Sequence, residues 1–336
     1  MPKNKPKAVF YTFVPDMNDY LKSKTKKLNV KIINEPLNKK NIDPKTEILG
    51  VFVDSKVNKE VLDKLPELKM ITTFSTGYDN VDIKEAKKRG IPVCNVPTYG
   101  ENTVAQHAMA LILTLSRRIF VAAERAKHGI YDYHGLRGFD LKDKTVGVVG
   151  TGHIGIYLIK MLKGFEVDVI AYDAFPKKSL QKKHGFKYVS TLNTLLSKSD
   201  IISMHVPLFP STYHMINTKN IKKIKKGSYI INTARGGLIE PKALLWALET
   251  NRINGAGLDV FEDEELIDAP KRVLNKIKDK KKLKNNEINH KIINHPNTVV
   301  TPHSAFNSTE AIKRIIDTAV DNVNAYLSGK RQNDVT

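Results

Sequence analysis

The sequence predicts an α/β protein built from parallel sheets and divided into two domains. Short runs of β-branched and aromatic residues alternate with helical stretches along the whole chain, which is typical of parallel strands joined by crossover helices. The near-continuous valine and isoleucine in "TVGVV" and "YIIN" indicates central strands covered on both faces. At 336 residues, the chain is longer than a single domain usually is. The predicted strands lie in "KAVFYTF", "KIINEP", "ILGVFVD", "MITTFS", "PVCNVP", "TVGVVG", "VDVIAYD", "IISMHVP", "SYIINTA" and "NTVVTP".

Two long helices set the predicted domain organisation. Residues 101–129 carry apolar side chains at helical spacing and end at a glycine, Gly129, so they form a helix long enough to connect two domains. A second helix is predicted from Ser308 to about Leu327, where it returns the chain to the first domain. The sequence therefore predicts a discontinuous first domain, residues 1–104 and 306–336, with the second domain, residues 105–305, inserted in it.

The charge of the chain is strongly basic, with a net charge of +20 and an isoelectric point near 9.7. Most lysines are spread along the chain, whereas residues 271–291 form one dense run. Because that run has no interleaved aromatic residues, it is interpreted as a solvated helical insertion. We expect no nucleic-acid partner.

Composition also sets the expected compartment. No run approaches about 18 uncharged apolar residues, and the apolar part of the amino terminus is too short for a secretion signal. The single cysteine, Cys94, excludes an internal disulfide and a cysteine-based zinc cluster. We therefore expect a soluble cytoplasmic protein with no membrane partner and no metal site.

A glycine turn supplies the first functional signal. In "VGVVGTGHIG", Gly150, Gly152 and Gly155 follow a predicted strand and precede a predicted helix. This order suits a dinucleotide pyrophosphate, which binds at the turn and at the amino terminus of the helix. Asp173 ends the next strand, where a carboxylate would accept bonds from the adenosine ribose hydroxyls and repel a 2′-phosphate. NAD is therefore favoured over NADP.

Polar residues after three other strands are candidates for the chemistry. Arg235 follows "YIINTA" and could bind a carboxylate at two points. His303 follows "TVVTP", and a neighbouring carboxylate would keep its imidazole protonated for general acid catalysis. In "GLDVFEDEE", five acids lie within seven residues, with Asp259 at a strand end and Glu264 five residues later. The residues alone do not decide among Glu264 and its neighbouring acids.

Seven stretches together resemble the D-isomer-specific 2-hydroxyacid dehydrogenase family, along nearly the full length. The stretches are "FSTGYDNVD", "NVPTYGENTVAQHA", "GFDLKDKTVGVVGTGHIG", "SMHVPLFPSTYHMIN", "NTARGGLIE", "GLDVFEDEE" and "TPHSAF". The resemblance implies a Rossmann NAD-binding domain inserted in a discontinuous flavodoxin-like substrate domain, and a homodimer. Within the family, the chain is most similar to the D-lactate dehydrogenase branch, through "HGLRGFDL", "VPTYG" and "HSAF".

The resemblance assigns site residues by position. It implies that Arg235, Glu264 and His303 are catalytic, which selects Glu264 among the crowded acids. It implies a substrate pocket with the backbone of Thr76 and Gly77 and the side chains of Tyr99, Phe306 and Arg235. The implied cofactor residues are Gly150, Gly152, His153, Ile154, Gly155, Asp173, Val206, Pro207, Thr212, Thr233, Ala234, Arg235 and Asp259.

The resulting expectation is reversible NADH-dependent reduction of a small 2-keto acid, pyruvate first, to the D-2-hydroxy acid, here D-lactate. One alternative is a relative that reduces hydroxypyruvate, glyoxylate or a branched-chain 2-keto acid. An alternative of another class is an NADH-sensing binding protein or corepressor. The lysine-rich segment 271–291 departs from the family pattern and lies between Glu264 and His303, so it puts substrate choice in doubt.

Overall fold

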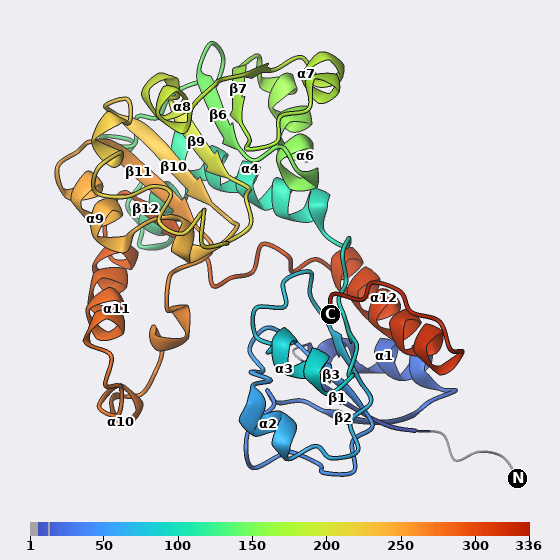
Figure 1. Cartoon of the computed structure of the whole chain (residues 1–336). Coiled ribbons are helices and arrows are strands. Elements are labelled where there is room, and N and C mark those ends of the chain that lie inside the picture. The colour runs from blue at the N-terminus through green and yellow to red at the C-terminus, as the bar shows by residue number, and fades with distance from the viewer. Residues whose placement is uncertain (1–5, 13) are drawn as a thin grey trace, which may run out of the picture. The chain divides into compact units, whose positions relative to one another are not determined.

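The computed structural model describes residues 6–12 and 14–336, and it divides into two compact units. The first unit comprises residues 1–100 and 307–336, and the second comprises residues 101–306. Each unit is built on one parallel sheet (Figure 1). The predicted fold class, a Rossmann domain inserted in a discontinuous flavodoxin-like domain, is confirmed.

The first unit has a five-stranded sheet in the order β2-β1-β3-β4-β5, which is the flavodoxin-like order. Its long carboxy-terminal helix, α12 (Thr309–Leu327), confirms the helix predicted from Ser308 to about Leu327. The side chain of Ser308 accepts a hydrogen bond from the Ala311 amide and caps this helix. The strands are β1 (Lys7–Tyr11), β2 (Asn29–Ile33), β3 (Ile48–Val51), β4 (Met70–Thr73) and β5 (Val93–Cys94). The other helices are η1 (Pro15–Met17), α1 (Asn18–Thr25), α2 (Lys59–Asp63) and α3 (Ile83–Lys88).

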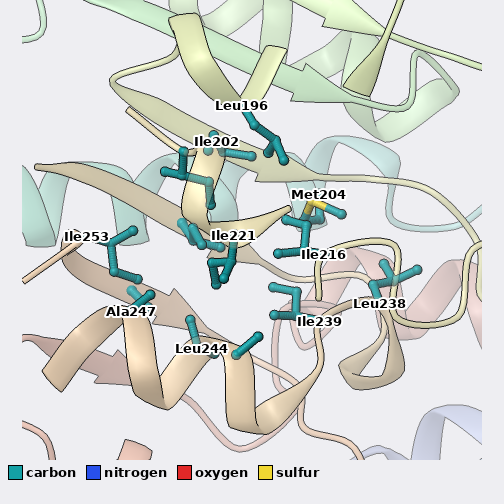
Figure 2. Close-up of a cluster of buried hydrophobic side chains, with 14 of the residues drawn as sticks. Leu196, Ile202, Met204, Ile216, Ile221, Leu238, Ile239, Leu244, Ala247 and Ile253 are labelled. Atoms are coloured by element: carbon teal, nitrogen blue, oxygen red, sulfur yellow. The ribbon is translucent and has the colours of Figure 1, made fainter. Parts of the chain in front are cut away.

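The second unit has a seven-stranded sheet in the order β12-β11-β10-β9-β6-β7-β8, so β6 and β9 flank the point where the strand order reverses. Figure 2 shows the core on one face, a cluster of buried side chains that includes Ile202 and Met204 of β9 and Leu244 and Ala247 of α9. The strands are β6 (Thr145–Val149), β7 (Asp168–Tyr172), β8 (Lys187–Tyr188), β9 (Ile201–Met204), β10 (Ser228–Asn232), β11 (Ile253–Leu258) and β12 (Thr298–Val300).

Helices cover both faces of this second sheet. They are α4 (Glu101–Arg117), α5 (Ile119–Lys127), α6 (His153–Leu162), η2 (Lys163–Phe165), α7 (Lys178–His184), α8 (Leu192–Lys198), η3 (Ile221–Lys223), η4 (Gly236–Leu238), α9 (Pro241–Glu249), η5 (Glu264–Leu266), α10 (Lys271–Leu274) and α11 (Lys280–Ile293). Within the described ranges, no single helix has the length and apolarity needed to cross a membrane, although the bent pair α4 and α5 has both together.

The predicted helix over 101–129 is wrong in one respect, because it breaks between α4 and α5 with a bend of 68°. Arg118 adopts a left-handed conformation at the break, with φ of 50°. The carbonyl of Ser116 accepts a hydrogen bond from the Phe139 amide at 2.9 Å, so a distant segment takes a carbonyl that a continuous helix would use itself. The local helical spacing carries no signal of this contact.

Two further differences concern short or polar segments. The strand β8 was not predicted, because two residues at a sheet edge give no periodic pattern. The lysine-rich run contains the helices α10 and α11 as expected, but the interpretation of it as a solvated insertion is wrong for α11. That helix buries Asn285, Asn286, Asn289 and Ile292 within the second unit.

Candidate active site

Two of the three glycines in the turn between β6 and α6 are required by close backbone packing, and the third faces open space. Gly150 has φ of +97°, which is the left-handed region, and a Cβ atom on it would lie 2.6 Å from the His205 carbonyl oxygen. A Cβ atom on Gly155 would lie 2.1 Å from the Gly150 oxygen, so α6 packs directly on the turn. At Gly152 a Cβ atom would meet nothing within 4 Å. The backbone is therefore open at the amino terminus of α6, where His153 and Ile154 begin the helix.

Asp173 is bonded to this turn. Its Oδ2 accepts hydrogen bonds of 2.7 Å from both the amide and the hydroxyl of Thr151, and its Oδ1 accepts one of 2.9 Å from the Phe175 amide. Burial opposes ionisation of this carboxyl, but these bonds and the charge of Lys177 outweigh burial and hold its pKa below the ordinary value. An ionised carboxylate is thus bonded to the glycine turn through Thr151. The sequence did not predict the role of Thr151, which donates two of these hydrogen bonds to Asp173.

The loops after β9 and β10 lie at the same edge of the sheet as the glycine turn, because β9 pairs in parallel with β6 and β10. After β9, the hydroxyl of Thr212 donates to the Pro207 carbonyl at 2.7 Å and closes the loop that contains Val206. After β10, Thr233 has a buried hydroxyl with no partner among the described residues, and Ala234 follows it. A buried hydroxyl without a protein partner is consistent with a contact to a ligand at this edge.

Glu264 and His303 form a close pair. The Nδ1 atom of His303 lies 2.6 Å from Oε1 of Glu264, and the two side chains remain 35% and 38% exposed. Burial raises the pKa of Glu264, but the hydrogen bond and charge of His303, the Phe261 amide and the charge of Arg235 outweigh it, so the pKa lies below its ordinary value. The carboxylate is therefore ionised and orients the imidazole through Nδ1, which leaves the opposite nitrogen, Nε2, as the atom that can exchange a proton with a ligand.

Asp259 holds the loop that carries His303. Its buried carboxylate accepts hydrogen bonds of 2.9 Å from the Ser304 and Ala305 amides, and one of 2.5 Å from the Thr301 hydroxyl. His303 itself has φ of 49°, a left-handed conformation that these bonds maintain.

His107, on α4, extends the network with its Nε2 atom 3.0 Å from the Thr301 oxygen. The sequence interpretation missed both His107 and Thr301, and "TPHSAF" gives no sign of a bond from its threonine to an aspartate in another strand.

The backbone next to Arg235 places this residue close to Glu264 and His303. It follows β10, and its carbonyl accepts a hydrogen bond of 2.9 Å from the Asn232 side chain. The next residue, Gly236, packs so closely on the segment before Glu264 that a Cβ atom on it would lie 1.8 Å from the Phe261 carbonyl carbon. The structure thus brings Arg235, Glu264 and His303 into one part of the second unit, beside the glycine turn's edge of the sheet.

The remaining predicted residues, apart from Phe306, lie in the first unit. Thr76 and Gly77 follow β4 and Tyr99 follows β5, and the two strands are neighbours, so all three residues lie at one edge of that sheet. The Thr76 hydroxyl donates to the Val96 carbonyl at 2.7 Å, and the Ser75 hydroxyl donates to the Gly77 carbonyl at 2.6 Å. In both bonds the acceptor is a backbone carbonyl oxygen of the loops that follow β4 and β5. Phe306 is the last residue of the second unit.

Comparison with known proteins decides the family. Residues 109–305 match the description "D-isomer specific 2-hydroxyacid dehydrogenase, NAD binding domain". The chain is 39% identical to a glyoxylate reductase of Thermofilum pendens over 295 residues, which are 87% of this chain and 81% of the relative. The chain belongs to the D-isomer-specific 2-hydroxyacid dehydrogenase family.

Two solved structures are similar to this 2-hydroxyacid dehydrogenase over almost its whole length. A pyruvate reductase of Chlamydomonas reinhardtii has a TM-score of 0.86 and 34% identity, covering 97% of both chains. D-lactate dehydrogenase of Aquifex aeolicus, complexed with NAD and lactic acid, has a TM-score of 0.84 and 34% identity, covering 96% of both chains. The cofactor of the family is NAD, and the open turn at Gly152 with the ionised Asp173 beside it fits that dinucleotide.

Proposed function

We propose that this dehydrogenase reduces a small 2-keto acid, with pyruvate favoured, to the D-2-hydroxy acid in a reversible NADH-dependent reaction. The observation that carries the proposal is the 2.6 Å pair of His303 and Glu264 on the same unit as the NAD-binding turn, with Arg235 close enough to lower the pKa of Glu264. A proton donor, a carboxylate that orients it and a guanidinium are the groups that reduction of a keto acid requires.

In the proposed reaction, Arg235 binds the substrate carboxylate at two points. NADH, when bound, supplies the hydride that reduces the keto carbon. His303 donates the proton from Nε2 to the keto oxygen, so the C=O group becomes a C–H and an O–H. Glu264 stays ionised and stabilises the imidazolium until the proton is transferred.

The cofactor set extends the same proposal. Asp173 binds the adenosine ribose and Gly150, Gly152 and Gly155 admit the pyrophosphate. The other residues proposed to contact NAD lie at the helix amino terminus and at the strand ends; they are His153, Ile154, Val206, Pro207, Thr212, Thr233, Ala234, Arg235 and Asp259.

The identity of the keto acid is tested with a substrate panel. The relatives that resemble this chain include a glyoxylate reductase and a pyruvate reductase. We favour pyruvate because the family resemblance assigns two aromatic residues, Tyr99 and Phe306, to the substrate. The experiment follows NADH oxidation by the purified protein with pyruvate, glyoxylate, hydroxypyruvate and 2-ketoisocaproate, and repeats each with NADPH.

The highest kcat/KM with pyruvate supports the D-lactate assignment. A higher value with another keto acid assigns that acid instead and refutes the role of the two aromatics. NADH binding with turnover of none of the four acids refutes the enzyme proposal and supports an NADH-sensing protein.

We propose further that the protein is a cytoplasmic homodimer. The segment from α5 onward exposes Ile119, Phe120, Ile130, Tyr131 and Tyr133, which are 50% to 96% accessible. Large apolar side chains gathered in this way are typical of a subunit interface. The buried free thiol of Cys94 fits a reducing compartment. Light scattering should give a dimer for the wild type and a monomer for a Phe120→Asp, Tyr131→Asp variant; a monomeric wild type refutes the assignment.

A further inference from the structure

The helix α11 (Lys280–Ile293), within the lysine-rich run, has an unusual buried face. Besides one apolar side chain, Ile292, it buries three asparagines, Asn285, Asn286 and Asn289, which are 8%, 5% and 0% exposed. A buried amide is costly unless it forms hydrogen bonds, so such a face needs a polar surface to pack on. That surface is the segment 261–265, which contains Glu264.

Three side chains of α11 bond the two residues before Glu264. The amide nitrogen of Asn289 donates to the Glu262 carbonyl at 2.8 Å, and that of Asn285 donates to Oδ2 of Asp263 at 3.1 Å. The Lys282 ammonium lies 3.0 Å from Oδ1 of Asp263. Because Asn285 and Asn289 are four residues apart, they lie on one face of the helix. The backbone of Glu262 and the carboxylate of Asp263 are both held by α11.

Glu262 is held from the opposite side as well. Its Oε1 accepts a hydrogen bond of 2.7 Å from the Tyr213 hydroxyl, and its Oε2 lies 2.6 Å from Nε2 of His214. Lys281 of α11 donates to the same Tyr213 oxygen at 2.8 Å. Gly236 also packs closely on the backbone nitrogen of Glu262, which further restricts the movement of this residue. Residue 262 therefore has little freedom to move.

Asp263 sets the direction in which the chain reaches Glu264. It has φ of 57°, a left-handed conformation that a residue with a Cβ atom rarely adopts. The bonds from Lys282 and Asn285 fix its carboxylate in this conformation. If they were lost, Asp263 could return to a right-handed conformation, and the first residue of η5, Glu264, would turn away from His303.

We propose that Lys282, Asn285 and Asn289 are positioning residues for the reaction, which hold Glu264 at His303 by fixing residues 262 and 263. This proposal rests on the proposed function in one respect, the role of Glu264 as the partner of the proton donor. The proposal assigns a functional role to part of the lysine-rich run. Two lysines of this run, Lys281 and Lys282, form ion pairs with acids of the segment 261–265.

The test compares two double variants of α11. The first, Lys282→Met with Asn285→Leu, removes both bonds to Asp263. The control, Lys284→Met with Asn286→Leu, makes the same chemical changes at an exposed lysine and at a buried asparagine, neither of which bonds the segment 261–265 among the described residues. We expect kcat for the best keto acid to fall about tenfold in the first variant, with NADH affinity unchanged, and to stay within about twofold in the control.

A second readout needs no substrate. The NMR chemical shifts of the His303 imidazole, assigned with a His303→Gln variant, are compared at one pH in the wild type and in both double variants. The Nδ1 atom of His303 lies 2.6 Å from Oε1 of Glu264, so displacement of Glu264 changes the surroundings of the ring and its chemical shifts. The Glu264→Gln variant gives the full change. We expect at least half of it in Lys282→Met with Asn285→Leu, and none in the control.

Equal chemical shifts of the His303 ring and equal kcat in the two double variants would overturn the positioning role, even if both lower the melting temperature, because a purely structural helix predicts that result. If Glu264→Gln itself changes neither the chemical shifts of the His303 ring nor kcat, the proposed role of Glu264 fails first. The two failures are therefore distinguishable.

Discussion

Gly236 gives a prediction whose size follows from the packing. In Gly236→Ala, the new Cβ atom would lie 1.8 Å from the Phe261 carbonyl carbon and 2.1 Å from the Glu262 nitrogen. Real Cβ atoms essentially never approach closer than 3.0 Å, so the two backbones must separate by about 1.2 Å, the difference between 3.0 and 1.8 Å. Both contacts are backbone, and no flexible side chain can yield instead.

Either direction of movement displaces a group assigned to catalysis. Movement on one side shifts Arg235, the residue before Gly236, and movement on the other shifts the segment that leads to Glu264. A displacement of about 1 Å costs on the order of 100-fold in rate. We therefore expect kcat for keto-acid reduction to fall by about that factor, with NADH affinity within about threefold of wild type.

The assay is steady-state NADH oxidation, with NADH affinity measured separately by fluorescence titration. Gly164→Ala is the matched control, because a Cβ atom at Gly164 meets nothing within 4 Å. A melting temperature for each variant shows that it is folded. A Gly236→Ala variant that is folded and keeps kcat within twofold of wild type would refute the reasoning.

Three further predictions concern single groups. Arg235→Lys should lower kcat/KM by at least about tenfold, because an ammonium cannot make the planar two-point contact, and full activity would exclude that contact. The pKa of Glu264 lies below the ordinary value for a glutamate, so Glu264 stays ionised and paired with His303 until the pH falls through this lowered pKa. The rate of reduction should therefore be flat down to about pH 5, and an acid limb near pH 6 would contradict this. Asp173→Ser should raise kcat/KM with NADPH relative to NADH by about tenfold, and an unchanged ratio would remove Asp173 from cofactor discrimination.

The sequence predicted the parallel sheets and the glycine turn because both depend on local patterns. The acids of "GLDVFEDEE" show what the sequence alone could not decide. Glu264 could not be chosen from spacing, because the choice depends on partners far along the chain. In the structure, Glu262 pairs with His214, Asp263 pairs with Lys282, and Glu264 pairs with His303.

Other features could not be predicted for the same reason. The break between α4 and α5 depends on an amide at Phe139 that bonds back to Ser116. The buried face of α11 was misread because Asn285 and Asn289 are polar residues, which hydrophobic periodicity assigns to the surface. The network that joins His107 to Asp259 is likewise invisible in a sequence, since its members come from separate elements.

The most direct test of the central claim is the His303→Ala variant. Turnover of the best keto acid and the dissociation constant for NADH are measured on the same preparation. If His303 donates the proton to the keto oxygen, kcat falls at least about 100-fold while NADH binding stays nearly unchanged. A kcat close to that of the wild type would contradict the account, because the close pair of His303 and Glu264 would then have no part in the reaction.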